Sequence, residues 1–159
     1  MIKTPTSFFI ALFFVGFVVN TADSFGAGIG QFDEIRLNDL QGGFGGQQIV
    51  IRPGGQYQIK IIRPSRQGLE TREFSGKLRP RDLNRLLRTF KKVRFETIQI
   101  RPRAGLPDEA RPEIVLVQAG KTIKKSKWAS DKHDRFDRLY GTLLAIIKHE
   151  EDRVVMLKH

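Results

Sequence analysis

Apolar and polar residues alternate in three stretches of the first half of the chain, and a period of two predicts β-strands. A shorter stretch of the same kind follows a polar loop at 65–71. The expected strands are residues 34–38, 47–51, 56–63 and 73–75, with turns at 42–46 and 52–55 separating the first three. Glycine is frequent in both turns, which suits the positive φ of a tight reversal.

The next stretch changes to the period of an α-helix. Residues 78–93 are expected to form this helix, and Pro80 suits its first turn because proline has no N–H to satisfy there. Leu87 is among the residues expected to be buried. The full apolar side of the helix comprises Leu83, Leu86, Leu87, Phe90 and Val93.

Two more strands and a second helix complete the pattern. The strands are expected at 113–117 and 122–128, around a turn at Gly120. Ser130 can cap the helix that follows, whose apolar stripe spans 136–147. This order predicts an α+β fold, an antiparallel sheet of about five strands with two amphipathic helices packed on one face. The strand residues expected to fill the core under the helices are Tyr57, Ile59, Ile61, Val115 and Val117.

The N-terminus carries the pattern of an export signal. Lys3 precedes twelve apolar or glycine residues, Phe8 to Val19, whereas a membrane-spanning helix needs about 20 apolar residues. The short run is typical of a signal peptide cleaved after Ser24, although cleavage after Gly26 fits nearly as well. An uncleaved anchor is the alternative. We therefore expect an exported protein, periplasmic or extracellular, that meets the membrane only through this segment. The expected divisions are a signal peptide at 1–24, a flexible leader at 25–32, one domain at 33–149 and a charged tail at 150–159.

Composition narrows the chemistry. The chain has 159 residues and a net charge of +11, from 28 Lys and Arg against 17 Asp and Glu, so its surface attracts polyanions or acidic proteins. It has no cysteine, which excludes disulfides, thiolate metal sites and thiol nucleophiles. The domain must therefore rely on apolar burial, and its hydrophobic fraction of 40% is that of a globular protein.

Basic residues gather on one side of the first helix. At about 100° per residue, four of them fall opposite the leucines. They form a basic stripe, Arg81, Arg85, Arg88 and Lys92. The stripe is either a docking surface for anions or a solvated helix face. Few aromatic residues interleave it, so we do not expect sequence-specific nucleic-acid binding.

Arginine also precedes five of the seven prolines. Proline ends strand ladders and helices, so these pairs mark the boundaries of elements. Their arginines either form a binding rim along one sheet edge or recur by chance in an arginine-rich chain. They are Arg52, Arg63, Arg79, Arg101 and Arg111.

We find no catalytic constellation, and we expect no metal and no cofactor. The acidic run at 131–137 is interleaved with cations, which is typical of a solvated helix start. His149 lacks the second histidine of a zinc-protease helix, because Arg153 occupies that position. Asp108 and Glu109 form a carboxylate pair, but they lie in a loop among arginines, where we expect both to be exposed.

Several of these features together resemble emfourin, a small proteinaceous inhibitor of thermolysin-like metallopeptidases. They are a Gly42-Gly43-Phe44-x-Gly46 turn, Phe95 near a helix end, Pro107-Asp108 before a strand, and two strands around Gly120. The likeness spans residues 35–147 and includes the terminal amphipathic helix. It implies binding to a metallopeptidase. Secreted bacterial domains of unknown function are similar in the same turn and in Gly76-Lys77-Leu78.

The first functional hypothesis is an exported, non-catalytic interaction domain that binds another protein, as a peptidase inhibitor does. It predicts a rigid exposed loop, at 42–46 or 101–111. The binding residues expected in the first of these are Gly42, Gly43, Phe44 and Gly46. The second hypothesis is a domain that binds an acidic polymer or the cell envelope through the basic stripe. A small-molecule-binding domain or an enzyme would instead need a concave sheet face with converging polar groups.

Overall fold

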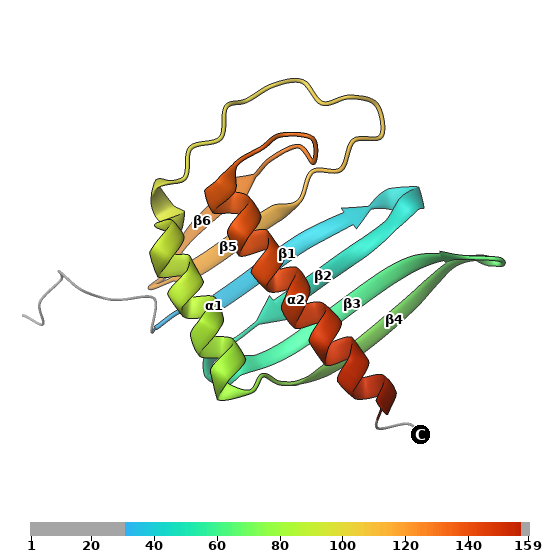
Figure 1. The fold of residues 1–159 in the computed structure, drawn as a ribbon, viewed down its shortest axis with the longest axis horizontal. Helices are drawn as coiled ribbons and strands as arrows, with labels where there is room; N and C mark the ends of the chain where they lie inside the picture. The colour runs from blue at the N-terminus through green and yellow to red at the C-terminus, as the bar shows by residue number, and fades with distance from the viewer. Residues whose placement is uncertain (1–30, 157–159) are drawn as a thin grey trace, which may run out of the picture.

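The computed structural model describes residues 31–156, which form six β-strands and two α-helices (Figure 1). The strands are β1 (Glu34–Gln41), β2 (Gly45–Ile51), β3 (Gln56–Ser65), β4 (Gly68–Lys77), β5 (Glu113–Gln118) and β6 (Lys121–Ser126). The helices are α1 (Pro80–Val93) and α2 (Asp134–Met156), with short 3-10 turns η1 (Gly42–Phe44), η2 (Pro53–Gly55) and η3 (Phe95–Thr97). The signal peptide expected at 1–24, the leader up to residue 30 and residues 157–159 lie outside the described part. No helix within that part is long and apolar enough to cross a membrane.

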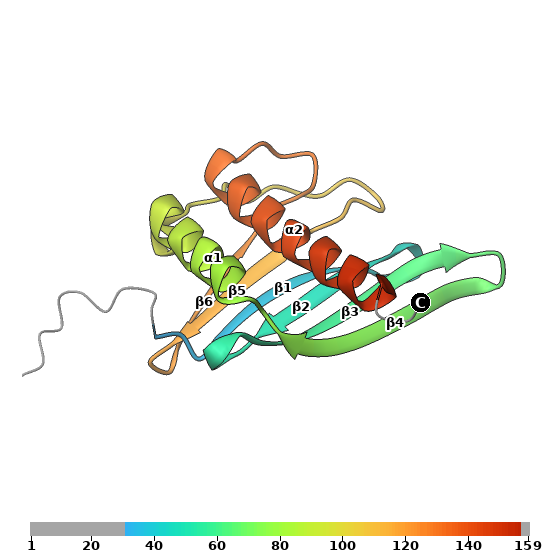
Figure 2. The ribbon, with the colours of Figure 1, turned by 60° about the horizontal axis from the view of Figure 1, so that its bottom comes forward.

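The six strands form one antiparallel sheet in the order β4-β3-β2-β1-β5-β6. Both helices lie on the same face of this sheet, and α2 crosses it diagonally (Figure 1, Figure 2). The predicted α+β class and antiparallel sheet are confirmed, with six strands instead of about five.

The core fills the space between the helices and one face of the sheet. Ile35 and Leu37 of β1 are fully buried there. The expected Tyr57, Ile59 and Ile61 of β3 are buried in the same cluster. Burying a side chain of this size contributes about 1.5–3 kcal/mol. The helices contribute Leu86, Phe90, Phe136, Leu139 and Leu143, all fully buried.

Val115 is buried as expected, but neither Val115 nor Val117 belongs to the core cluster that faces the helices. Ile114 and Leu116 do so instead, because Ile114 pairs directly with the buried Leu37 of β1. Four consecutive apolar residues at 114–117 carry no period of two, so the sequence pattern does not select a face.

The additional length of sheet comes from β4, which was expected only at 73–75. The polar stretch at 65–71 is not a loop, because β3 and β4 form a long hairpin that turns at 66–67. β4 is an edge strand, and most of its side chains are exposed. Charged residues protect such an edge from pairing with another chain, and they also hide the period of two.

Three predicted boundaries shift in the structure. α1 begins at Pro80 rather than at residue 78, which places the proline at the first helical position. Phe32, assigned to the leader, is buried in the core. α2 continues to Met156, so residues 150–156 are helical rather than a charged tail, and Glu150 is fully buried.

α2 begins at Asp134 and is not capped by Ser130. Its first turn is closed by side chains on both sides of the start. The Nδ1 atom of His133 accepts the Phe136 N–H (3.2 Å), and the Asp137 carboxylate accepts the His133 N–H (2.9 Å). This reciprocal pair satisfies backbone donors that a helix N-terminus otherwise leaves open.

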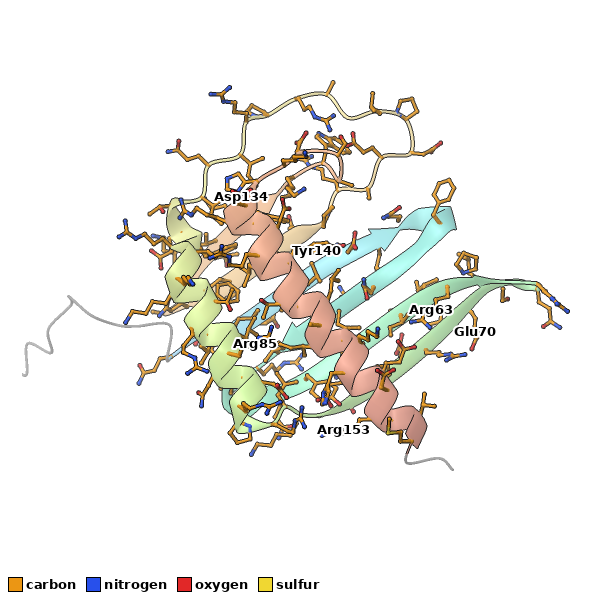
Figure 3. The ribbon with its side chains drawn as sticks, viewed as in Figure 1. Arg63, Glu70, Arg85, Asp134, Tyr140 and Arg153 are labelled. Carbon is orange, nitrogen blue, oxygen red and sulfur yellow. The ribbon has the colours of Figure 1, made fainter. Side chains whose placement is uncertain are left out.

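Two tyrosine–carboxylate hydrogen bonds, one buried and one partly buried, join α2 to the sheet. Tyr140 of α2 donates to Asp39 of β1 (2.6 Å), and Tyr57 of β3 donates to Glu150 of α2 (2.7 Å). Burial raises the pKa of Asp39 and, together with the neighbouring carboxylates, the pKa of each tyrosine. Arg153 donates to the Tyr57 hydroxyl (3.2 Å) and pairs with Glu150 (2.7 Å). Figure 3 shows Tyr140 and Arg153 well apart along α2, so the helix is held at two separated points.

Replacing Leu86 by alanine should lower the free energy of unfolding by about 2–5 kcal/mol, because a fully buried side chain leaves a cavity. Leu87→Ala should cost less, since Leu87 is only half-buried although both leucines share the apolar side. The exposed double variant Arg85→Gln/Arg88→Gln should stay within about 0.5 kcal/mol of the wild type. Urea unfolding followed by circular dichroism measures all three. A larger loss for Leu87→Ala than for Leu86→Ala would contradict the orientation of α1.

Candidate functional site

The basic stripe of α1 lies on the outer surface of the helix. Its four members are all exposed. Figure 3 shows Arg85 on α1, well away from Arg63 and Glu70 of the β3–β4 hairpin. Arg81 and Arg85 line a pocket of 200 Å³, but Asp82, His149 and Glu150 line it too. In this pocket, the carboxylates of Asp82 and Glu150 therefore offset the positive charge of Arg81 and Arg85.

The same pocket contains a cluster with metal-ligand chemistry. Asp82, His149 and Glu150 offer ligand atoms within 4.8 Å of one another. Arg79 donates to Asp82 (2.9 Å) and lies 2.7 Å from Nε2 of His149, while Arg153 pairs with Glu150 (2.7 Å). Guanidinium groups thus already provide the positive charge that a metal ion would supply, and we assign no metal to this cluster.

The two loops expected to be rigid and exposed reach the same end of the molecule. The loop at 98–112 starts beside the end of α1 and runs across to the side away from α1, where η1 and the β3–β4 hairpin also lie (Figure 1, Figure 2). We call η1 and the turn Leu106–Glu109 together the loop end. Phe44 is 62% exposed and Leu106 is 65% exposed. The basic stripe is not brought to this end.

Glycine fixes the conformation of the chain after η1. Gly45 and Gly46 have φ values of 89° and 124°, in the region that side chains rarely adopt. A Cβ on Gly46 would overlap the carbonyl oxygen of Asp39, and one on Gly45 would overlap that of Ile62. Gly46 therefore sets the backbone, whereas Phe44 is the residue of this turn that presents a side chain to solvent.

Arg103 braces the long loop from inside. Its Nε donates to Asp131 (2.7 Å), and one terminal nitrogen donates to both Glu109 (2.7 Å) and Ser130 (2.7 Å). The other terminal nitrogen donates to the carbonyl of Ala104 (2.8 Å). These bonds connect both arms of the loop to the segment that precedes α2.

The tip of the loop is a tight turn from Leu106 to Glu109. Pro107 presets φ at its second position, and Asp108 adopts a φ of 59° at its third. The Glu109 N–H donates to the Leu106 carbonyl (3.2 Å), and the Leu106 N–H donates back to the Glu109 carboxylate (3.0 Å). The Leu106 side chain is therefore presented by a closed turn.

Trp128 packs against the inner side of the loop. Its Nε1 donates to the Arg103 carbonyl (3.0 Å). The guanidinium groups of Arg103 and Arg111 lie 5.7 Å and 5.1 Å from the ring centroid, within cation–π range. A Cβ on Gly105 would overlap the ring, so the loop needs glycine at this position to close over it.

We call the hydrogen bonds from Arg103 to Glu109, Ser130 and Asp131 the Arg103 brace. Glu109 is its electrostatic partner within the loop. The hydrogen bond from Arg103, followed by those from Leu106 and Ser130, holds the pKa of the Glu109 carboxyl well below its usual range. The side chain of Glu109 is only 7% exposed, so the expectation of an exposed carboxylate is wrong for Glu109, while Asp108 is exposed as expected.

Sequence reasoning identified the loop but missed its brace. Arg103, Glu109 and Trp128 are separated by up to 25 residues, and no local pattern connects them. Gly105, in a loop that also contains three prolines, is the only sequence signal of the close packing. It marks a backbone position that needs space without identifying the ring that fills it.

Comparison with known proteins does not assign the chain to a family. No protein-family model matches the chain, and no curated protein matches it in sequence. The relation to emfourin therefore remains a hypothesis that rests on the residues that suggested it.

Gly46→Ala should be strongly destabilising, because the positive φ alone costs about 1–3 kcal/mol for a non-glycine residue and the new Cβ overlaps Asp39. Gly43→Ala is the matched control, since a Cβ there meets nothing within 4 Å. Thermal unfolding of the two variants should show a large loss for the first and almost none for the second. Equal losses would mean that the glycines of this turn are interchangeable.

The brace should also respond to pH. A depressed carboxyl pKa contributes stability that is complete above the ordinary value of 4.5 and is lost as the pH falls through the lower, folded value. The emission of Trp128, the single tryptophan of the chain, should therefore stay constant from pH 7 to 4.5 and shift in more acidic solution. Arg103→Gln should already shift it at pH 7, whereas Arg66→Gln at the exposed β3–β4 turn should not. Emission of Arg103→Gln identical to the wild type at neutral pH would refute the brace.

Proposed function

We propose that this domain is a protein-binding module that holds its partner through the loop end, with an extracellular metallopeptidase as the first partner to test. The observation that carries the proposal is the exposure of two apolar side chains, Phe44 and Leu106. Each is a large, mostly exposed apolar side chain on a turn whose backbone is fixed, and both turns lie at one end of the molecule. The proposal places the domain outside the cytoplasm, on the strength of the signal pattern at 1–24.

The energetics favour binding by these two side chains. Neither belongs to the core cluster, and covering each one with a partner would contribute about 1.5–3 kcal/mol. The glycines after η1 and the Arg103 brace order the two turns before any partner arrives. Little conformational entropy is then lost on association, which is the main benefit of preorganised loops. A few buried anchors of this kind typically supply most of the energy of an interface.

The sheet supports a non-catalytic role. Under α1 and the first half of α2, its helix-covered face is filled by core side chains. Near the end of α2 the same face is hollowed, but the arginines that line this hollow are already paired, Arg63 with Glu151 and Arg72 with Glu70. On the opposite face Lys60 of β3 and Glu73 of β4 form a neighbouring-strand ion pair (3.0 Å), which is a surface contact and not an acid–base pair in a cleft. The sequence-level absence of a catalytic constellation is consistent with this role.

The test is inhibition of a thermolysin-like metallopeptidase by the purified protein. Phe44→Ser and Leu106→Ser should each weaken inhibition by about 30-fold, as expected for an anchor worth about 2 kcal/mol. Met156→Ser is the matched control, because Met156 is 76% exposed at the end of α2 and outside the loop end. All three variants should unfold at the wild-type temperature.

If the wild type inhibits no peptidase of this class, the same variants test the wider proposal. Proteins from native extracellular fluid are then captured on the wild type and on Phe44→Ser/Leu106→Ser and compared. A partner that binds both equally well would show that the loop end is not the binding surface.

A further inference from the structure

A second concave site lies where the start of the long loop meets β6. It is a cavity of 440 Å³ lined by six basic side chains, and we call it the basic cavity. The six are Arg101, Arg103, Arg111, Lys124, Lys125 and Lys127. Asp131 is the one acidic residue in its lining. The proposed loop end does not use these side chains.

Two of the six cations are already neutralised. Arg103 pairs with Asp131 (2.7 Å) and with Glu109 (2.7 Å). Lys127 is buried, donates to the Asp131 carbonyl and pairs with Asp137 (3.1 Å). Both are therefore structural, and they hold the wall of the cavity in place.

The other four cations have no ion-pair partner anywhere in residues 31–156. They are Arg101, Arg111, Lys124 and Lys125. Like charges gathered around one concavity repel each other, and a low-dielectric wall focuses their field into it. An anion in the cavity would remove this repulsion. The stripe on α1 differs in this respect, because carboxylates line its pocket.

One of the unpaired cations is held in position by an aromatic ring. Arg111 lies over the Trp128 ring, 5.1 Å from its centroid, and precedes the buried Pro112. Lys124 and Lys125 are consecutive residues of the edge strand β6, and both line the cavity at this edge. Of the five arginine–proline pairs in the sequence, the pairs at 101–102 and 111–112 thus meet at one sheet edge, while the arginines of the other three do not line this cavity.

We propose that the basic cavity binds the sulfate or carboxylate groups of a linear acidic polysaccharide. Its volume is roughly fifteen times the 30 Å³ that one water occupies in the liquid, which suits part of a chain better than a single ion. β6 is an edge of the sheet, so the site is open along the strand, where the exposed Lys121 adds a further cation. Lysines on an edge strand resist the pairing that an acidic peptide strand would need.

Nucleic acid fits the cavity less well. Binding of single strands depends on aromatic faces on which bases stack. Trp128 is the only aromatic residue in the lining, and Arg103, Arg111 and Gly105 are packed against its ring. A saccharide chain carries its charges without needing such a face.

The experiment titrates the purified protein with a heparin-derived octasaccharide and follows Trp128 emission and heat of binding at several salt concentrations. Lys124→Gln/Lys125→Gln should weaken binding about tenfold at low salt, as expected for two exposed charge contacts. The slope of log affinity against log salt should fall by about two, one for each lysine. Arg85→Gln/Arg88→Gln on the stripe removes the same charge and should leave both values nearly unchanged.

A second pair, Arg101→Gln/Lys124→Gln, keeps the test decisive if the first variant unfolds. Equal losses from the cavity and stripe variants would overturn the proposal, because net charge alone would then explain binding. A thymidine oligonucleotide of equal charge that binds as tightly, with the same dependence on Lys124 and Lys125, would overturn the choice of a polysaccharide.

Discussion

The arrangement of the molecule depends on how α2 is fixed across the sheet. Its two tyrosine–carboxylate bonds join positions 101 and 93 residues apart. The Tyr57–Glu150 bond is buried, where water competes little, and the Tyr140–Asp39 bond is partly buried. Apolar packing alone is non-directional, so it brings the helix to the sheet without selecting one crossing angle. The bonds of Tyr140 and Glu150 supply the direction, and the diagonal position that results leaves the ends of the hairpins uncovered (Figure 1).

The two proposed sites, the loop end and the basic cavity, share the loop at 98–112 but use different parts of it. Arg103 and Trp128 divide the loop into an inner and an outer side. Leu106 at the tip is exposed to solvent, while Arg101 and Arg111 line the basic cavity together with Lys124 and Lys125 of β6. A protein held at the loop end and a polymer held in the basic cavity would therefore contact different parts of one rigid element, and each would meet it already ordered.

Much of the fold follows from local patterns, and the exceptions have physical causes. β1 to β3 and both helices have one buried side each, so their periods are visible in the sequence. β4 has no fully buried residue and only Phe74 packs against the core, whereas 114–117 has apolar residues on both sides, so neither shows a usable period. At the candidate site, Phe44 was identified from a local glycine motif. The brace around Arg103 is made of contacts between distant segments, which no single stretch of sequence encodes.

The brace has a consequence for where such a domain can operate. Small exported domains commonly close long loops with disulfides, which must be formed by oxidation and are lost in reducing surroundings. Here one arginine closes the loop at 98–112 in a chain that has no cysteine. The shape of the loop is reached by folding alone and is independent of the redox poise around it. The domain needs no thiol-oxidising catalyst to fold, and reductants have no disulfide in it to break.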